Sequence, residues 1–203
     1  MFRAMMVFTG LVALAAAGRL QATIVWQDSY YQILDGDTYD TDLIVVSPPS
    51  GQYTVVDVFG GVVDAMTLYE SGTLNTYGGK VGLIMIRSGA ELNMHHGEVH
   101  YLHVYTGGDA NLRGGTIPNV SFDGGAIVNL YAYDVTFSPD TPASFEGCIS
   151  GRWYADDTMF TIHLDAPSWH DRDRISIIPE PAAVLLLGLG GLALRNRGSS
   201  ANP

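Results

Sequence analysis

The residues best suited to chemistry form a histidine-rich segment near the middle of the chain. Four of the six histidines fall within residues 95–103. In an extended strand alternate side chains point the same way, so His96, Glu98 and His100 would share one face. Imidazole and carboxylate groups on one face could bind Zn²⁺ or a similar ion. The simpler interpretation, which we favour, is that this segment is solvated polar surface.

Nucleophilic chemistry has less support in the sequence. The chain has one cysteine, Cys148, so no intramolecular disulfide can form, and we expect a small buried residue there. A catalytic thiol would need a nearby base, and the neighbouring sequence suggests none. A phosphate-binding loop followed by lysine, a G-x-S-x-G motif and an H-E-x-x-H motif are also missing from the sequence. We therefore expect neither an enzyme nor a cofactor.

The charge balance bears on the kind of partner. The chain has 21 acidic and 10 basic residues and a net charge of -11, which repels phosphate backbones and argues against nucleic-acid binding. A neutral polysaccharide or a matrix rich in divalent cations is a better neighbour. A carbohydrate-active enzyme stays open as an alternative, and it would need two carboxyl groups paired at a defined gap. A carbohydrate-binding module is another, because five aromatic residues could stack on sugars: Tyr101, Tyr105, Tyr131, Tyr133 and Trp153.

An 18-residue repeat organises the middle of the chain. Glycine pairs occur at 60–61, 78–79 and 114–115, and His96-Gly97 fills the missing place. Asparagines recur in phase at Asn75, Asn93, Asn111 and Asn129, with Asp57 one period earlier. Three apolar columns keep the same period: Val63, Val81, Val99 and Ile117; Leu68, Ile86, Val104 and Phe122; and Leu74, Leu92, Ala110 and Val128. The histidines at 100 and 103 fall in outward columns of unlike residues, which favours polar surface.

This period predicts an all-β fold with a short parallel β-solenoid over residues 54–137, in which each 18-residue turn of the coil is one rung. A helical-pair repeat needs roughly 33 residues or more. The repeat is also rich in Gly, Val, Thr, Tyr and Asn, which favour strands and turns over helices. Rungs would stack at ~4.8 Å, so the asparagines would form a ladder whose amides donate and accept hydrogen bonds along the row.

Both ends of such a solenoid need cover, because exposed edge strands pair with other chains. Residues 23–53 are expected to form an N-terminal cap or an irregular first rung. Residues 138–178 are expected to form a C-terminal β cap, with strands at 149–154 and 159–164 on either side of a hairpin turn. A turn at 138–142 would separate the rungs from this cap.

The two ends of the chain have the features of targeting signals. Residues 1–22 predict a secretory signal with a helical apolar centre, cleaved after Ala17 or Ala22. The C-terminus has three parts in order: Pro179-Glu180-Pro181, the apolar residues 182–194, and the basic residues Arg195 and Arg197. A helix over the apolar part would span ~20 Å, less than the ~30 Å hydrocarbon core, so it suits temporary anchoring.

This order of motif, apolar span and basic cluster resembles the PEP-CTERM sorting domain of exported bacterial proteins. The resemblance covers residues 179–203. It implies recognition and cleavage by an exosortase-type membrane protease, transient anchoring in the inner membrane, and delivery to the cell surface or the exopolysaccharide matrix. Because unrelated proteins carry this tail, it implies nothing about the rest of the chain. Together with the repeat, it leads us to expect an exported cell-surface or extracellular-matrix protein with a structural or display role.

Overall fold

The computed structural model describes residues 23–139, 147–165, 168 and 171–179. The expected signal segment at 1–22 and the tail beyond Pro179 lie outside these residues, as do the two helices expected there. Within the described part of the chain, no helix has the length and apolar character needed to cross a membrane.

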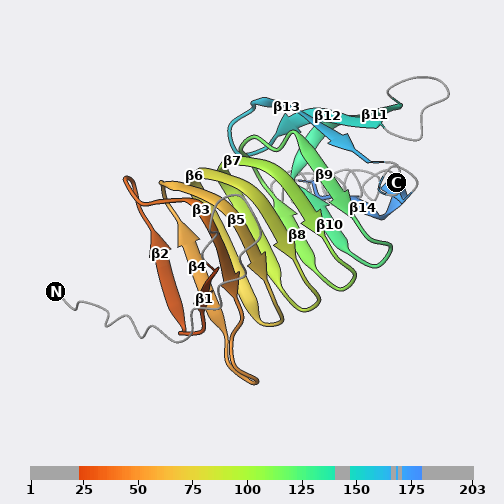
Figure 1. Ribbon diagram of the computed structural model, residues 1–203. Helices are drawn as coiled ribbons and strands as arrows, with labels where there is room; N and C mark the ends of the chain where they lie inside the picture. The colour runs from red at the N-terminus through yellow and green to blue at the C-terminus, as the bar shows by residue number, and fades with distance from the viewer. Residues whose placement is uncertain (1–22, 140–146, 166–167, 169–170, 180–203) are drawn as a thin grey trace, which may run out of the picture.

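The described residues form a β-solenoid of about 6 turns, which confirms the predicted all-β solenoid class (Figure 1). Its elements are β1 (Thr23–Trp26), β2 (Tyr30–Ile33), β3 (Thr38–Val46), β4 (Thr54–Val58), β5 (Val62–Leu68), β6 (Gly72–Ile86), β7 (Glu91–Val104), β8 (Asp109–Leu112), β9 (Asn119–Phe122), β10 (Ile127–Leu130), β11 (Ala132–Pro139), β12 (Gly147–Trp153), β13 (Met159–Leu164), a single 3-10 turn η1 (Arg172–Arg174) and β14 (Ile175–Ile177).

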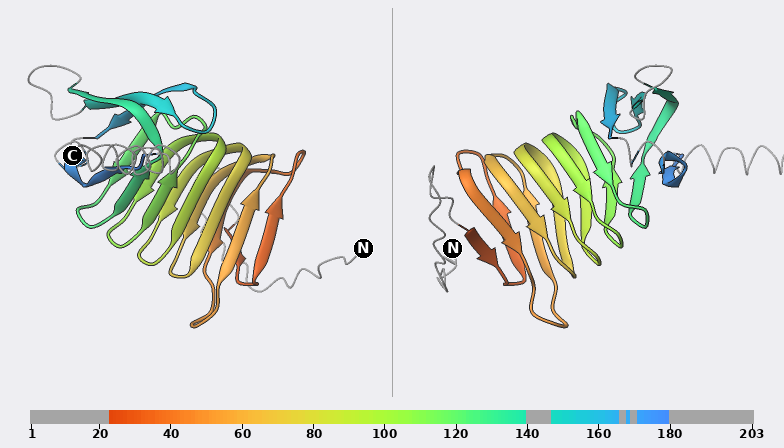
Figure 2. Two further views of the ribbon diagram at one scale, coloured as in Figure 1. Left: turned by 180° about the vertical axis from the view of Figure 1, so that it is seen from behind. Right: turned by 45° about the vertical axis from the view of Figure 1, so that its right-hand side comes forward.

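Each rung consists of two strand segments joined by two corners, so the solenoid has two faces. Face A contains β2, β4, residues 72–76 of β6, residues 91–94 of β7, β8, β10 and β14. Face B contains β1, β3, β5, residues 80–86 of β6, residues 98–104 of β7 and β9. The strands of both faces lie side by side along one axis, from β1 and β2 at one end to β9 and β10 near the other (Figures 1 and 2).

The register follows the predicted 18-residue period in the central rungs. Parallel pairing places Val63 beside Val81 and Val81 beside Val99, and the asparagines at 75, 93, 111 and 129 beside one another. The one irregularity between β6 and β7 is at the corner, where Tyr77 pairs with His96. That bulge falls where histidine replaces the first glycine of the recurring pair.

The core lies between the two faces. The three apolar columns predicted to point inward are at most 3% exposed at every position. Stacking equivalent residues rung on rung keeps each column continuous, so burial of apolar surface extends along the whole axis.

The N-terminal strands continue the solenoid with longer connections. β1, β2 and β3 pair in parallel with β3, β4 and β5, at offsets of 20 (Thr23 to Leu43), 25 (Tyr30 to Val55) and 24 (Thr38 to Val62) residues. The first rungs are therefore irregular, which is why the 18-residue period fails to reach them. At this end of the core, Trp26 and Tyr31 stack with ring centroids 4.5 Å apart.

The C-terminal end is covered by strands that leave the repeat. The predicted hairpin is confirmed, since β12 and β13 pair antiparallel, and β11 pairs antiparallel with β12. The turn predicted at 138–142 is wrong at its start, because Ser138 and Pro139 belong to β11 and pair with Cys148 and Gly147. Pro139 is tolerated there because it ends an edge strand, where its missing N–H breaks no ladder. β13 then returns to pair with β9, and β14 with β10 (Figure 2).

Candidate functional site

The histidine segment lies on the outer surface of β7. His96, Glu98 and His100 are all exposed, and the Glu98 carboxylate forms an ion pair with the Lys80 ammonium at 2.9 Å. His96 lies in the corner bulge, so the strict alternation that would align it with the other two side chains is interrupted. In the part of the chain that the structure describes, no three His, Cys, Asp or Glu side chains come close enough to hold a metal ion. The arrangement expected for a zinc site is therefore not assembled.

The asparagine column forms a hydrogen-bonded ladder on the outer side of face A. The side-chain amide of each asparagine donates to the oxygen of the residue one rung earlier. The donor–acceptor distances are 2.8 Å from Asn75 to Asp57, 3.1 Å from Asn93 to Asn75, 3.1 Å from Asn111 to Asn93 and 2.9 Å from Asn129 to Asn111. At the N-terminal end, the Tyr30 hydroxyl donates to the second Asp57 carboxylate oxygen at 2.7 Å.

Two carboxylates flank this ladder. The amide of Asn111 also donates to Glu91, and that of Asn129 to Asp109, so both hydrogens of each amide are used. Partial burial, together with the Glu91 carboxylate one rung away, raises the pKa of Asp109 above its ordinary value. The outer side of face A is thus a braced polar surface rather than a set of independent side chains.

A second ladder runs along one corner of the solenoid, at 18-residue intervals. The Phe59 and Tyr77 rings stack with centroids 5.1 Å apart, and the Tyr77 and His95 rings at 5.0 Å. The Arg113 guanidinium, one period after His95, lies 3.6 Å from the centroid of the Tyr131 ring. Burial first, and then the charges of Arg113 and His96, lower the pKa of His95 below its ordinary value, which favours the neutral stacked ring.

The aromatic residues considered for sugar stacking are engaged in contacts within the protein. The Tyr105 and Tyr131 rings are covered by the guanidinium groups of Arg87 and Arg113, at 3.7 and 3.6 Å. The Tyr133 ring lies against Tyr154. The remaining two are Trp153, which is fully buried, and Tyr101, whose hydroxyl bonds to Ser121. Since sugars stack on open ring faces, these contacts weaken the carbohydrate-binding interpretation that rests on those aromatic residues.

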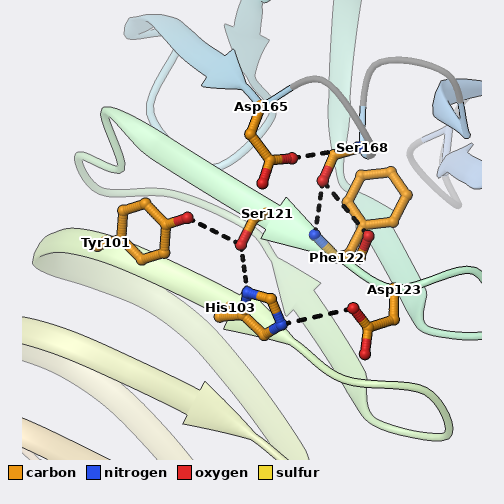
Figure 3. Close-up of polar contacts among 7 residues, drawn as sticks. All are labelled: Tyr101, His103, Ser121, Phe122, Asp123, Asp165 and Ser168. Atoms are coloured by element: carbon orange, nitrogen blue, oxygen red, sulfur yellow. Dashed lines mark hydrogen bonds and ion pairs between the residues drawn. The ribbon is translucent and has the colours of Figure 1, made fainter. Parts of the chain in front are cut away.

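A polar cluster at the junction of face B and the C-terminal cap was not predicted from the sequence (Figure 3). The Ser121 hydroxyl accepts a 3.0 Å hydrogen bond from the Tyr101 hydroxyl and is bonded to Nδ1 of His103. Nε2 of His103 lies 3.6 Å from an Asp123 carboxylate oxygen. The available signal was that His103 and Ser121 are one period apart, with Asp123 on the same side of the strand.

This cluster contains the residue types of a hydrolytic triad but not its working geometry. Ser121 is only 1% exposed, and its hydroxyl is shared between Tyr101 and His103. A nucleophilic serine must instead present its oxygen to a substrate. Nearby, the Ser168 hydroxyl accepts from the Phe122 N–H at 2.7 Å and donates to the Phe122 carbonyl at 3.4 Å. These contacts satisfy the β9 edge where β13 stops pairing, so the cluster seals the end of the stack.

The cysteine prediction is corrected by the structure. Cys148 is half-buried, and its Sγ lies 3.4 Å from Nδ1 of His163, directly across from it in the β12–β13 hairpin. A base therefore does stand beside the thiol. The sequence held the signal, because any hairpin turning between Ala155 and Asp156 brings positions 148 and 163 opposite each other.

Comparison of the chain with protein-family models, with curated proteins and with solved structures found no match in any of the three.

Proposed function

We propose that this protein is an exported structural or display element of the bacterial cell surface or extracellular matrix, carried there by its C-terminal sorting tail. The observation that carries this proposal is the use of outward-facing residues to brace the solenoid itself. Side chains that a binding or catalytic surface would present are instead stacked on their neighbours in the asparagine ladder and the corner ladder.

Such bracing suits a stiff spacer. Backbone hydrogen bonds join the rungs throughout, side-chain amide hydrogen bonds join face A from Asp57 to Asn129, and stacked rings join the corner from Phe59 to His95. A solenoid bound at every level to its neighbours resists bending and local opening better than one held by backbone bonds alone.

The join between body and tail supports the same proposal. Only Ile178 separates β14 from Pro179, and Pro179 is exposed. A sorting motif that follows the last strand so closely would place the body near the membrane until an exosortase-type protease cuts the tail. Once released, the negatively charged body would reach the surface or the exopolysaccharide matrix.

Expression of the full chain in a bacterium that has an exosortase-type protease tests this route. The matched control carries Pro179→Ala, Glu180→Ala and Pro181→Ala together. Mass spectrometry of the C-terminus should show that the wild-type chain loses its apolar tail and leaves the membrane fraction, while the control keeps the tail and remains there. If both chains keep the tail in cells that cut an established substrate of the same protease, the sorting proposal is wrong.

A further inference from the structure

A shallow depression lies on the outer side of face B, away from both ladders. It has a volume of about 200 Å³, and its lining residues come from four consecutive strands of face B: β3, β5, β6 and β7. Its lining residues are Asp40, Val62, Val63, Asp64, Lys80, Val81, Gly82, Glu98 and His100. Pockets for drug-sized ligands measure roughly 300–1,000 Å³, so this depression suits a single small ring.

The depression exists because of one glycine in an outward column. Gly82 lies between Asp64 on the rung before and His100 on the rung after. A Cβ at Gly82 would lie 2.5 Å from the Asp64 carbonyl oxygen and 3.5 Å from an Asp64 carboxylate oxygen. Because such a Cβ would collide with the rung before it, position 82 carries no side chain, whereas the neighbouring rungs carry the polar side chains of Asp64 and His100.

A bulge in β3 builds the N-terminal wall. Between Tyr39 and Leu43 the chain advances four residues, while its partner β5 advances only two, from Val63 to Ala65. The two extra residues displace this part of β3 from the regular ladder, and exposed Asp40 lines the depression from that side. The sequence irregularity that ended the 18-residue period thus shapes this site.

The lining combines hydrogen-bond acceptors with an apolar floor. Asp40, Asp64 and Glu98 supply carboxylates, and Lys80, ion-paired with Glu98, supplies a donor. Val62, 40% exposed, offers its methyl groups to the same space. Carboxylates accept from vicinal hydroxyls, methyl groups pack on the C–H face of a pyranose, and three carboxylates against one ammonium disfavour an acidic sugar.

We propose that this depression binds one uncharged hexose unit of a neutral polysaccharide. The inference deepens the proposed surface role, on which it rests, by naming the matrix component that the solenoid contacts. It places that contact on the outer side of face B rather than on Tyr105, Tyr131, Tyr133 and Trp153, which already contact other side chains or are buried. A divalent cation is the competing occupant, and it becomes an outcome of the test.

Ligand-observed NMR on the purified full chain in detergent micelles tests the proposal. The probes are neutral gluco-, galacto- and manno-oligosaccharides, with glucuronate and glucosamine as charged comparators, all in the presence of EDTA. Because a single-ring contact is weak, we expect a dissociation constant on the order of 1 mM for at least one neutral series. Binding of glucuronate should be about tenfold weaker or worse, because the lining has more carboxylates than ammonium groups and repels an anion.

Asp64→Asn replaces a charged acceptor with a neutral amide, and His100→Ala removes a lining side chain, so each should weaken binding about tenfold. Glu70→Gln, an exposed acid at a corner outside the depression, is the matched control and should bind as the wild type does. The proposal fails if no neutral series binds, or if glucosamine or glucuronate binds more tightly than every neutral series. It also fails if the Asp64→Asn and His100→Ala variants both bind like the wild type while keeping its circular dichroism. Binding that appears only when Ca²⁺ replaces EDTA would likewise overturn it. None of these outcomes depends on tail cleavage, so failure here is distinguishable from failure of the sorting route.

Discussion

At the scale of single residues, the asparagine ladder has a direction. Every amide donates toward the N-terminus, so the first position of the row needs a group that only accepts. Asp57 meets this need, because its carboxylate takes hydrogen bonds from both Asn75 and the Tyr30 hydroxyl. Asn75, Asn93 and Asn111 each both donate and accept, which neither serine nor aspartate could do with the same reach.

Removing a central member of the ladder should therefore cost two hydrogen bonds at once. Asn93→Ala would leave the Asn75 oxygen without its donor and one hydrogen of the Asn111 amide without its acceptor. We expect a loss of about 1–3 kcal/mol in the free energy of unfolding, measured by urea denaturation. Asn119→Ala is the control, because that asparagine lies off the ladder and donates only to the His100 carbonyl, at 3.2 Å. Equal losses in the two variants would show that the ladder contributes nothing beyond ordinary surface contacts.

At the scale of the element, the corners decide where a strand must end. The second glycine of each pair has a positive φ, between 74° and 104° from Gly61 to Gly115. At the opposite corner, Ser71 has a φ of 64° where later rungs have Gly89, Gly107 and Gly125. The stacking of the rungs thus imposes a positive φ at this corner, and Ser71 adopts it although serine is not glycine.

Two glycines with similar φ allow the cost of the backbone conformation to be measured apart from the cost of crowding a neighbouring rung. Gly79, with a φ of 74°, would place a Cβ 2.4 Å from the Gly60 carbonyl oxygen, whereas Gly36, with a φ of 91°, has nothing within 4 Å. Gly36→Ala should cost about 1 kcal/mol from the left-handed conformation alone. Gly79→Ala should cost at least ~2 kcal/mol, because the rung below must also move. Thermal unfolding of both variants checks this, and a smaller loss for Gly79→Ala than for Gly36→Ala would contradict the stacked register.

At the scale of the whole molecule, the sequence predicted what repeats and missed what does not. The inward columns and the central register follow from the period, because a parallel stack places equivalent residues in contact. The period could not predict the N-terminal rungs, because their paired strands are offset by 20 to 25 residues and share no common period. The His103–Ser121 and Cys148–His163 contacts were overlooked although the register carried a signal for each, since the first pair is one period apart and the second lies opposite across the hairpin. The Ser168–Phe122 contact joins the repeat to the segment after β13, where only the final packing sets the neighbours.

The C-terminal cap must do more than cover apolar surface, because it is what prevents the last rung from pairing with another chain. Trp153 of β12 is fully buried, and its ring stacks on that of Phe160 with the centroids 4.1 Å apart. Its indole N–H donates a 3.0 Å hydrogen bond to the carbonyl of Gly115, the last member of the glycine-pair series. It is thus a direct tie between the cap and the repeat. Losing it should loosen the cap as a unit and expose the edges of β9 and β10.

Trp153→Ala should therefore lower the free energy of unfolding by about 3–5 kcal/mol and also produce concentration-dependent association. Trp153→Phe keeps an aromatic ring beside Phe160 but removes the indole donor, so its loss should be nearer to ~1 kcal/mol, without association. Hydrogen exchange at Phe122, whose N–H is held by Ser168, reports on the cap directly, and light scattering reports on association. Suppose that Trp153→Ala lost stability but remained monomeric, with the Phe122 N–H still protected from exchange. The cap would then contribute to stability alone and would not be needed to prevent the last strands from pairing with another chain.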